Sequence, residues 1–388
     1  MSGFDFDTPV DRHASGSYKW DDTPDSKIIP MWVADMDFRT APVVIEALRK
    51  RVEHGVFGYT LVDDSYYDSL TTWFNTRHGY RFDRKQVIYT SGVVPALSAI
   101  IKALAPEGSK VALQTPVYNC FFSSVRNNGC IIADAPLKRV DTGAEAFTYL
   151  MDFDALERVC SDENVKLMLL CNPHNPAGRC WTRNELEKVA EITHRHGVRV
   201  VSDEIHCELT MPGHRYIPYA TVDPEAIVCV SPSKAFNTAG LQIANIICPD
   251  ADIRKAVDKA ININEVCDVN PFGPVALKAS YSNEGKEWLE ALKKYLWHNW
   301  VYLKETLNRR LPKCKIAVLE ATYLPWIDVS SITDNSSLLE QKLKQEAKVW
   351  INSGDMYGQK GYIRINIACP RSSLAEGLDR LCNYLEKL

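Results

Sequence analysis

The strongest constraint on the fold of this chain is a regular alternation, between residues 64 and 281, of short apolar runs and longer amphipathic segments. The apolar runs are continuous, which is typical of strands buried on both faces of a parallel sheet. The segments between them have the length of helices that connect one strand to the next. The expected strands are QVIYTSG, KVALQTP, KLMLLCNP, VRVVSDE and AIVCVSPS. We therefore predict an α/β fold with a mainly parallel sheet.

The pattern changes after residue 281, and this change predicts a second, smaller unit. A long helical pattern covers residues 286–311, and two strand-like segments follow at 315–329 and 361–369. Helix and strands are segregated there, as in an α+β unit. We expect residues 46–281 to form the large domain and residues 282–388 the small one. The N-terminal segment, residues 1–45, is predicted to join the small domain.

Composition and charge exclude several classes of protein. The formal net charge is −4 with both signs interspersed, so we expect no nucleic-acid or membrane partner. No apolar stretch approaches the ~18 residues of a membrane span, and the acidic N-terminus lacks the apolar core of a secretory signal. The 12 cysteines are scattered without a CxxC pair. We expect them to be buried thiols of a cytoplasmic protein, and we disfavour disulfides.

The pair of histidines in HRH offers the clearest alternative, a metal site. His194 and His196 lie at the end of the helical pattern NELEKVAEITHRHG, directly before Gly197. Histidine favours a helix C-terminus because of the helix dipole, and glycine suits the residue that follows the helix. Since no third ligand is nearby, we interpret the pair as a helix end and predict no metal.

Polar side chains gather where the predicted strands end. Ser91 and Gly92 follow one strand, the loop NPHNPAG follows another, Asp203 ends a third, and Lys234 comes just after a fourth. Ligands bind at this edge of open α/β sheets, so we expect these residues to converge. Two Asn-Pro steps in one loop force extended or turn backbone, which indicates a loop whose shape matters.

Lys234 and Asp203 together indicate a particular cofactor. Each is a charged group at the end of a buried strand, where it costs free energy unless it has a partner. Asp203 alone would be interpreted as a helix cap or a structural ion pair. A buried lysine, however, is a good nucleophile toward a carbonyl, and a buried carboxylate can hold a pyridine nitrogen protonated. Pyridoxal 5′-phosphate needs both groups.

The same cofactor needs a phosphate site, and the sequence offers one. Gly92 and Val93 open a predicted helix, so their free N–H groups can face an anion. Ser231 and Ser233 add hydroxyl donors beside Lys234. A glycine before a helix is weak evidence alone, because most such glycines only make turns.

These motifs resemble a known family. CNPHNPAGR, SDEIH, SPSKAFNTAG and IRINIA are similar to the fold-type I pyridoxal-phosphate enzymes of aminotransferase class I/II, over essentially the whole chain. Within that superfamily, MWVADMDF, GYT, SGVVPAL, SDEIHCEL and SKAFNTAGLQ resemble the MalY/PatB-type cystathionine β-lyases. The resemblance implies a large domain built on a seven-stranded, mainly parallel sheet and a smaller α+β domain.

The resemblance also implies roles for individual residues. Lys234 would bind the cofactor covalently, Asp203 would pair with its ring nitrogen, and Tyr118 would stack on the ring and belong to the catalytic set. The remaining cofactor contacts would come from Asn175, His206, Gly92, Val93, Ser231, Ser233 and, from a neighbouring subunit of a homodimer, Tyr59. Many relatives have a tyrosine at the position of His206, so its contact stays open. Arg364, with help from Asn175, would bind the substrate carboxylate.

The expected reaction is α,β-elimination from cystathionine or a related cysteine derivative, giving a thiol, pyruvate and ammonia. Many aminotransferases carry a phosphate-binding arginine eight residues after the lysine, where this chain has Gln242. This difference favours the lyase subgroup. The alternatives are an aminotransferase and a regulatory or binding protein that keeps the cofactor fold. The intact set of Lys234, Asp203 and Arg364 argues against the binding protein.

Overall fold

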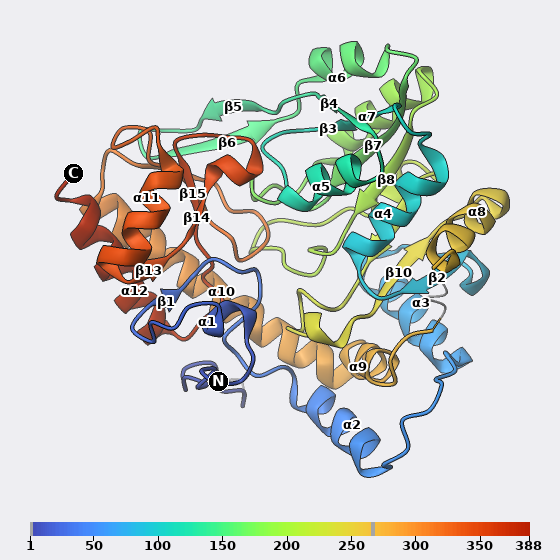
Figure 1. Cartoon of the computed structure of the whole chain (residues 1–388), viewed down its shortest axis with the longest axis horizontal. Helices are drawn as coiled ribbons and strands as arrows, with labels where there is room; N and C mark the ends of the chain where they lie inside the picture. The colour runs from blue at the N-terminus through green and yellow to red at the C-terminus, as the bar shows by residue number, and fades with distance from the viewer. Residues whose placement is uncertain (1–2, 265–267) are drawn as a thin grey trace.

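A central sheet of seven strands organises the molecule (Figure 1). The structure is a computed structural model that describes residues 3–264 and 268–388. The strand order of the central sheet is β2-β10-β9-β8-β7-β3-β4. The strands are β2 (Val87–Thr90), β10 (Ala244–Ile247), β9 (Ile227–Val230), β8 (Arg199–Asp203), β7 (Val165–Cys171), β3 (Lys110–Leu113) and β4 (Ile131–Asp134). Strands β9, β8, β7, β3 and β4 are parallel, whereas β10 is antiparallel to both its neighbours. The predicted α/β fold with a seven-stranded, mainly parallel sheet is confirmed.

Both faces of the inner strands of this sheet are buried, as the continuous apolar runs predicted, whereas the edge strand β4 is partly exposed. Along β9, Ile227 and Cys229 pack with α4 and α5, while Val228 and Val230 pack on the opposite face with α3, α9 and α10. Neighbouring residues of a strand point to opposite faces, so each must be apolar. The covering helices are α3 (Asp64–His78), α4 (Val93–Leu104), α5 (Asn119–Asn127), α6 (Phe153–Cys160), α7 (Arg183–Arg195), α8 (Ala251–Asn262), α9 (Phe272–Ser280) and α10 (Asn283–Arg310).

Helix α7 ends as the sequence predicted. Gly197 follows it with φ of 66°, and the N–H of Val198 donates to the carbonyl of Thr193 at 2.9 Å. The two histidines of HRH lie at this helix end. His194 contacts Asp223 at 3.0 Å, and His196 contacts Glu157 at 2.7 Å.

A second sheet combines strands from distant parts of the chain. Its order is β14-β15-β12-β11-β6-β5. These strands are β5 (Lys138–Asp141), β6 (Ala146–Leu150), β11 (Lys315–Ala317), β12 (Trp326–Asp328), β14 (Asn352–Ser353) and β15 (Tyr362–Arg364). β6 pairs in parallel with β11, so residues from the range predicted for the large domain extend the sheet of the C-terminal part. Helices α11 (Ser336–Lys342) and α12 (Arg371–Leu385) accompany this sheet.

The N-terminal segment lies against the C-terminal part of the chain. After α1 (Tyr18–Asp21), strand β1 (Ile29–Pro30) pairs with β13 (Val349–Trp350). Residues 31–38 then run along the second sheet toward α2 (Pro42–Glu53), and the N–H of Asp37 donates to the carbonyl of Ala368 at 2.8 Å. We call residues 31–38 the crossing segment. The division at residues 45 and 281 stays a prediction.

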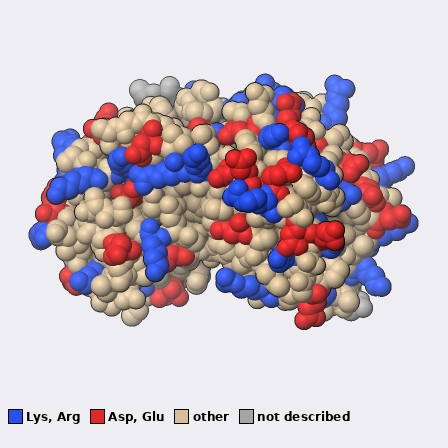
Figure 2. Space-filling view, turned by 90° about the horizontal axis from the view of Figure 1, so that it is seen from above, with Lys and Arg blue, Asp and Glu red and all other residues tan. Residues whose placement is uncertain are grey.

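Lysine and arginine are interspersed with acidic residues on the face shown in Figure 2. Within the described ranges no helix is long and apolar enough to span a membrane. The cysteines described there are free thiols, and all of them except Cys120 are buried. Cys267 lies outside the described residues.

Candidate active site

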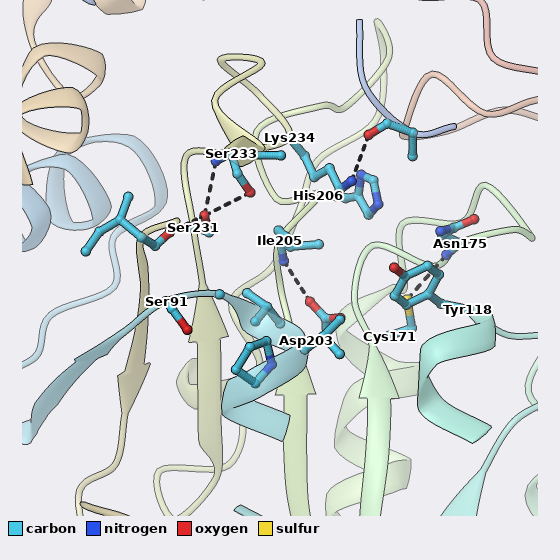
Figure 3. A pocket seen from close by; sticks show the side chains of 17 residues that line it. Ser91, Tyr118, Cys171, Asn175, Asp203, Ile205, His206, Ser231, Ser233 and Lys234 are labelled. Carbon is cyan, nitrogen blue, oxygen red and sulfur yellow. Dashed lines mark hydrogen bonds between the residues drawn. The ribbon is translucent and has the colours of Figure 1, made fainter. Parts of the chain in front are cut away.

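A cavity of about 190 Å³ opens where the strands of the central sheet end (Figure 3). Asp203 ends β8, Cys171 ends β7, and Ser231 directly follows β9. The predicted site residues that line this cavity are Gly92, Val93, Tyr118, Asn175, Asp203, His206, Ser231, Ser233 and Lys234. The structure therefore brings together residues separated by up to about 140 positions, at the sheet edge that the sequence indicated.

Lys234 enters the cavity from the loop after β9. Its Nζ donates to the carbonyl oxygen of Ala34 at 2.7 Å (Figure 3). Burial of the amine, and then the positive charge of Arg364, lower the pKa of Lys234 to about 8. An amine with this pKa is partly neutral near neutral pH, as a nucleophile or base must be.

Asp203 lies deeper in the cavity and is 3% exposed. Its Oδ1 accepts the N–H of Ile205 at 3.1 Å. Burial raises the pKa of Asp203 to about 6, against the opposing effects of that hydrogen bond and of the charge on Lys234. Lys234 is the charged side chain among the described residues that lowers this pKa, and a further cationic group bound in the cavity would stabilise the Asp203 charge.

Two aromatic side chains remain uncharged in the cavity. Burial, followed by the charges of Lys234 and Arg364, holds the pKa of His206 well below 6.5. Burial likewise holds the pKa of Tyr118 well above its usual range. Nδ1 of His206 has no hydrogen-bond partner in the described part of the chain. A buried polar atom without a partner is rare in a folded protein, and a bound ligand would supply one.

Arg364, on β15, reaches the cavity through Asn175. Its Nη1 donates to Oδ1 of Asn175 at 3.0 Å, and its Nη2 donates to the carbonyl of Trp32 at 3.1 Å. The guanidinium lies over the ring of Tyr357, 4.7 Å from its centre. Its Nε is buried and has no hydrogen-bond partner among the residues described. The peptide bonds Asn172–Pro173 and Asn175–Pro176 are both cis.

The opposite end of the cavity suits a phosphate. Gly92 precedes α4, so the N–H groups of the first turn, including that of Val93, have no partner within the helix. Ser231 Oγ lies 2.7 Å from the carbonyl of Ile243 and 2.9 Å from Ser233 Oγ, while the N–H of Ser233 donates back to Ser231 Oγ. Ser231 thus orients the loop. It has a single hydroxyl proton, which the Ile243 carbonyl can accept, and the neighbouring hydroxyl of Ser233 can turn toward an anion. These donors, with Lys234 and Asp203, fit pyridoxal 5′-phosphate.

Three residues named in the sequence analysis for the cofactor and substrate site do not line this cavity: Tyr59, Gln242 and Arg364, which reaches it through Asn175. Tyr59 is 99% exposed, and this chain does not place it in its own site. Gln242 is also exposed, with φ of 53°. No arginine lines the cavity within the described residues.

Sequence reasoning missed the contribution of the crossing segment. Its carbonyl groups accept from both Lys234 and Arg364, and Ala34 itself lines the cavity. The motif MWVADMDF drew attention to this stretch, but a backbone carbonyl has no signature in a sequence. Tyr323 was missed as well, because the partner of its phenol is the backbone carbonyl of Ala34.

Comparisons with known proteins agree with this geometry. Residues 26–381 match the family described as aminotransferase class I and II. The cystathionine beta-lyase PatB of Bacillus subtilis is 39% identical, over 97% of this chain and 98% of that protein. A PLP-bound putative aminotransferase from Clostridium difficile 630 has a TM-score of 0.94 and 39% identity, over 98% of this chain and 100% of that one. A PLP-bound C-S lyase from Staphylococcus hominis has a TM-score of 0.91 and 32% identity, over 98% of each chain. The family match covers nearly the whole chain and includes every residue described as lining the cavity, and the chain therefore belongs to the aminotransferase class I and II family.

Proposed function

We propose that this chain is a pyridoxal-phosphate-dependent C–S β-lyase, acting on L-cystathionine or related cysteine derivatives. The observation that carries the proposal is the placement of Lys234 and Asp203 in one cavity beside the Arg364–Asn175 pair. The names of the similar proteins, a cystathionine beta-lyase and a C-S lyase, support the choice of reaction.

The cavity residues would hold the cofactor by distinct contacts. Lys234 would bind it covalently, Asp203 would face its ring nitrogen, and Tyr118 would stack on the ring. Asn175 and His206 would reach the ring oxygen. The phosphate would bind to the N–H groups of Gly92 and Val93 and to Ser233, in the loop oriented by Ser231. When bound, the cofactor supplies the electron sink for the pair left behind as an amino acid loses its α-proton.

The residues of the chain would then bind and deprotonate the substrate. Arg364 would hold the carboxylate with two parallel hydrogen bonds, a geometry that a planar guanidinium favours. This contact fixes the direction of the Cα–H bond. Once the substrate amine has replaced it on the cofactor, Lys234 would have a free, neutral amine that takes the α-proton as general base. Asp203, ionised and buried, would stabilise a positive charge placed next to it.

Elimination follows when a sulfur leaving group stands on Cβ. The electron pair of the Cα–H bond forms the Cα=Cβ bond, and the pair of the Cβ–S bond leaves with the thiolate. The released 2-aminoacrylate takes up water to give pyruvate and ammonia. The alternative is an aminotransferase, which the name of one structural relative supports. Gln242 stands where many aminotransferases carry a phosphate-binding arginine, and this difference favours the lyase.

Cystathionine supplied alone should give pyruvate, ammonia and homocysteine over many turnovers, because elimination needs no second substrate. The three products are measured in a time course with excess substrate and no added 2-oxo acid. Activity that stopped after one turnover and resumed on adding a 2-oxo acid would identify an aminotransferase. A protein that bound the cofactor but turned over neither way would be a binding protein.

We also propose a homodimer in which Tyr59 reaches the phosphate in the partner's site. Val56, Phe57, Tyr59 and Leu61 form an apolar stretch that is largely exposed in the single chain, which supports an interface there. Tyr59→Phe should weaken cofactor retention about ten-fold or more, the effect of losing a hydrogen bond to a charged group. Retention is measured by dialysis. Tyr18→Phe, at another exposed tyrosine, serves as the control. A fully active monomer in sedimentation experiments would contradict the shared site.

Two coarser proposals concern location and domains. The predominance of buried free thiols supports a reducing, cytoplasmic location. The pairing of β1 with β13 supports assigning residues 1–45 to the small domain. Strands β5 and β6 do not fit a boundary at residue 281, because they precede it in the sequence and yet extend the sheet of the small domain.

A further inference from the structure

The carbonyl oxygen of Ala34 accepts hydrogen bonds from two side chains. The Lys234 amine donates at 2.7 Å, and the Tyr323 phenol donates at 3.0 Å. Tyr323 is completely buried, and burial together with the negative charge of Asp35 raises the pKa of its hydroxyl. The phenol therefore keeps its proton and is the donor. One acceptor serves both the reactive amine and a second, permanently protonated group.

Tyr323 is held firmly in this orientation. Its own carbonyl accepts the N–H of Ile367 at 3.0 Å, and its ring meets the ring of His206 edge-on. The preceding Thr322 has φ of 73°, where a β-branched residue is an outlier. Such a backbone costs free energy and persists only where the surroundings over-determine it, often at functional sites. Complete burial, the contact with His206 and the hydrogen bond to Ala34 hold the Tyr323 side chain in this direction.

The Ala34 carbonyl is also held without help from Tyr323. Asn366 Nδ2 donates to the neighbouring carbonyls of Val33 and Asp35, at 2.5 and 2.6 Å. Asn237 Nδ2 donates to the next one, of Met36, at 2.9 Å. Removing the phenol would leave the Ala34 carbonyl in place. The effect of the phenol on Lys234 can therefore be measured by itself.

We infer that Tyr323 is a positioning residue for Lys234. When the amine of Lys234 is free, the phenol shares the Ala34 carbonyl with it. When the amine is bound to the cofactor, the phenol keeps that carbonyl hydrogen-bonded. This inference rests on the proposed function, which makes Lys234 the covalent attachment point. An oxygen shared by two donors binds each less strongly than it would bind one, so the phenol loosens the hold on the amine. When the amine leaves, the phenol prevents a carbonyl without a partner. Both effects favour the engaged lysine over the free one.

Tyr323→Phe leaves the Ala34 carbonyl to Lys234 alone. A hydrogen bond to an ammonium is stronger than one to a neutral amine, so the protonated form gains. The pKa of Lys234 in the cofactor-free protein should rise from about 8 by roughly half a unit to one unit. The other groups whose charges face this amine remain unchanged in the variant: Arg364, Asp35, Asp203, Cys120 and His206. Competitive labelling with acetic anhydride across a pH series measures this pKa, with the other lysines as internal references.

The second measurement follows attachment of the cofactor. Pyridoxal 5′-phosphate is added at a series of concentrations, trapped by borohydride reduction and counted by mass spectrometry. The equilibrium constant for covalent attachment should fall about three- to ten-fold in Tyr323→Phe, because engagement now leaves the carbonyl without a donor. The matched control is Tyr66→Phe. Tyr66 is equally buried, and its phenol donates to Asn245 at 2.7 Å. The control should change neither quantity.

An unchanged or lowered pKa of Lys234 together with normal attachment would overturn the inference. Tyr323→Leu also lacks the hydroxyl and must shift both quantities in the same directions; opposite shifts would overturn it too. The labelling uses cofactor-free protein and is independent of which reaction the enzyme catalyses. Failure of the lyase proposal appears separately, in the products formed from cystathionine by the unmodified enzyme.

Discussion

Lys234→Ala should abolish turnover of every amino-acid substrate and remove covalent attachment of the cofactor. Lys234 is the one lysine that lines the cavity in the described part of the chain, so no second amine can replace it. It would act both as nucleophile and as general base, and the loss of the base alone costs about two to four orders of magnitude. Steady-state rates and borohydride trapping measure the two effects.

The matched control is Lys293→Ala. Lys293 is half-buried, and its Nζ donates to Thr210 Oγ1 at 3.1 Å, outside the cavity. This variant should keep both the turnover and the trapped cofactor. Reducible covalent cofactor at full occupancy in Lys234→Ala would show that another residue carries it, and the assignment of Lys234 would then be wrong.

Asp203→Asn should slow loss of the α-proton by roughly two to three orders of magnitude while the protein stays folded. An amide has nearly the shape of the carboxylate and can still accept the N–H of Ile205, but it carries no charge to stabilise a protonated ring nitrogen. Exchange of the substrate α-hydrogen with deuterated solvent measures this step directly. Asp223→Asn, at a buried aspartate paired with His194, should leave the exchange rate unchanged. Near-normal exchange in a folded Asp203→Asn variant would contradict the assigned role.

The same variant should alter how stability depends on pH. The folded pKa of Asp203, about 6, lies above the ordinary value of 3.8. Below both values the carboxyl is neutral in both states, and as pH rises toward 6 the unfolded state ionises more easily. Between pH 3.8 and about pH 6, ionisation of this group therefore lowers the free energy of unfolding of the cofactor-free protein. Asp203→Asn should remove this decrease. Melting temperatures across the range, compared with those of Asp223→Asn, measure the difference.

Most of the site could be predicted because its chemistry resides in side chains at strand ends. Runs such as VRVVSDE identify a buried strand locally, and parallel strands bring their carboxyl ends to one edge. The order of residues along the chain was therefore enough to place Lys234, Asp203 and Asn175 together. The helix end at Gly197 was also local information, carried by a single residue type.

The missed features depend on contacts between distant residues. Strand β10 enters the sheet antiparallel, between β2 and β9, although ANII reads like any buried strand. The pairing of β6 with β11 joins segments that have no shared pattern. The crossing segment acts through backbone carbonyls, which every residue possesses, so nothing in MWVADMDF indicates that Ala34 meets Lys234 and Tyr323.

The pairing of β6 with β11 has a consequence while the protein is being synthesised. β6 ends at Leu150, whereas β11 begins at Lys315, about 165 residues later. At typical translation rates the partner strand is made roughly 10 to 30 seconds after β6. During that interval one edge of β6 presents unpaired N–H and C=O groups, which can pair with another nascent chain. A chain that stopped before Lys315 would already contain Lys234 and Asp203, but it would have no Arg364 to complete its site. With the edge of β6 unpaired, it would be a substrate for chaperones and proteases.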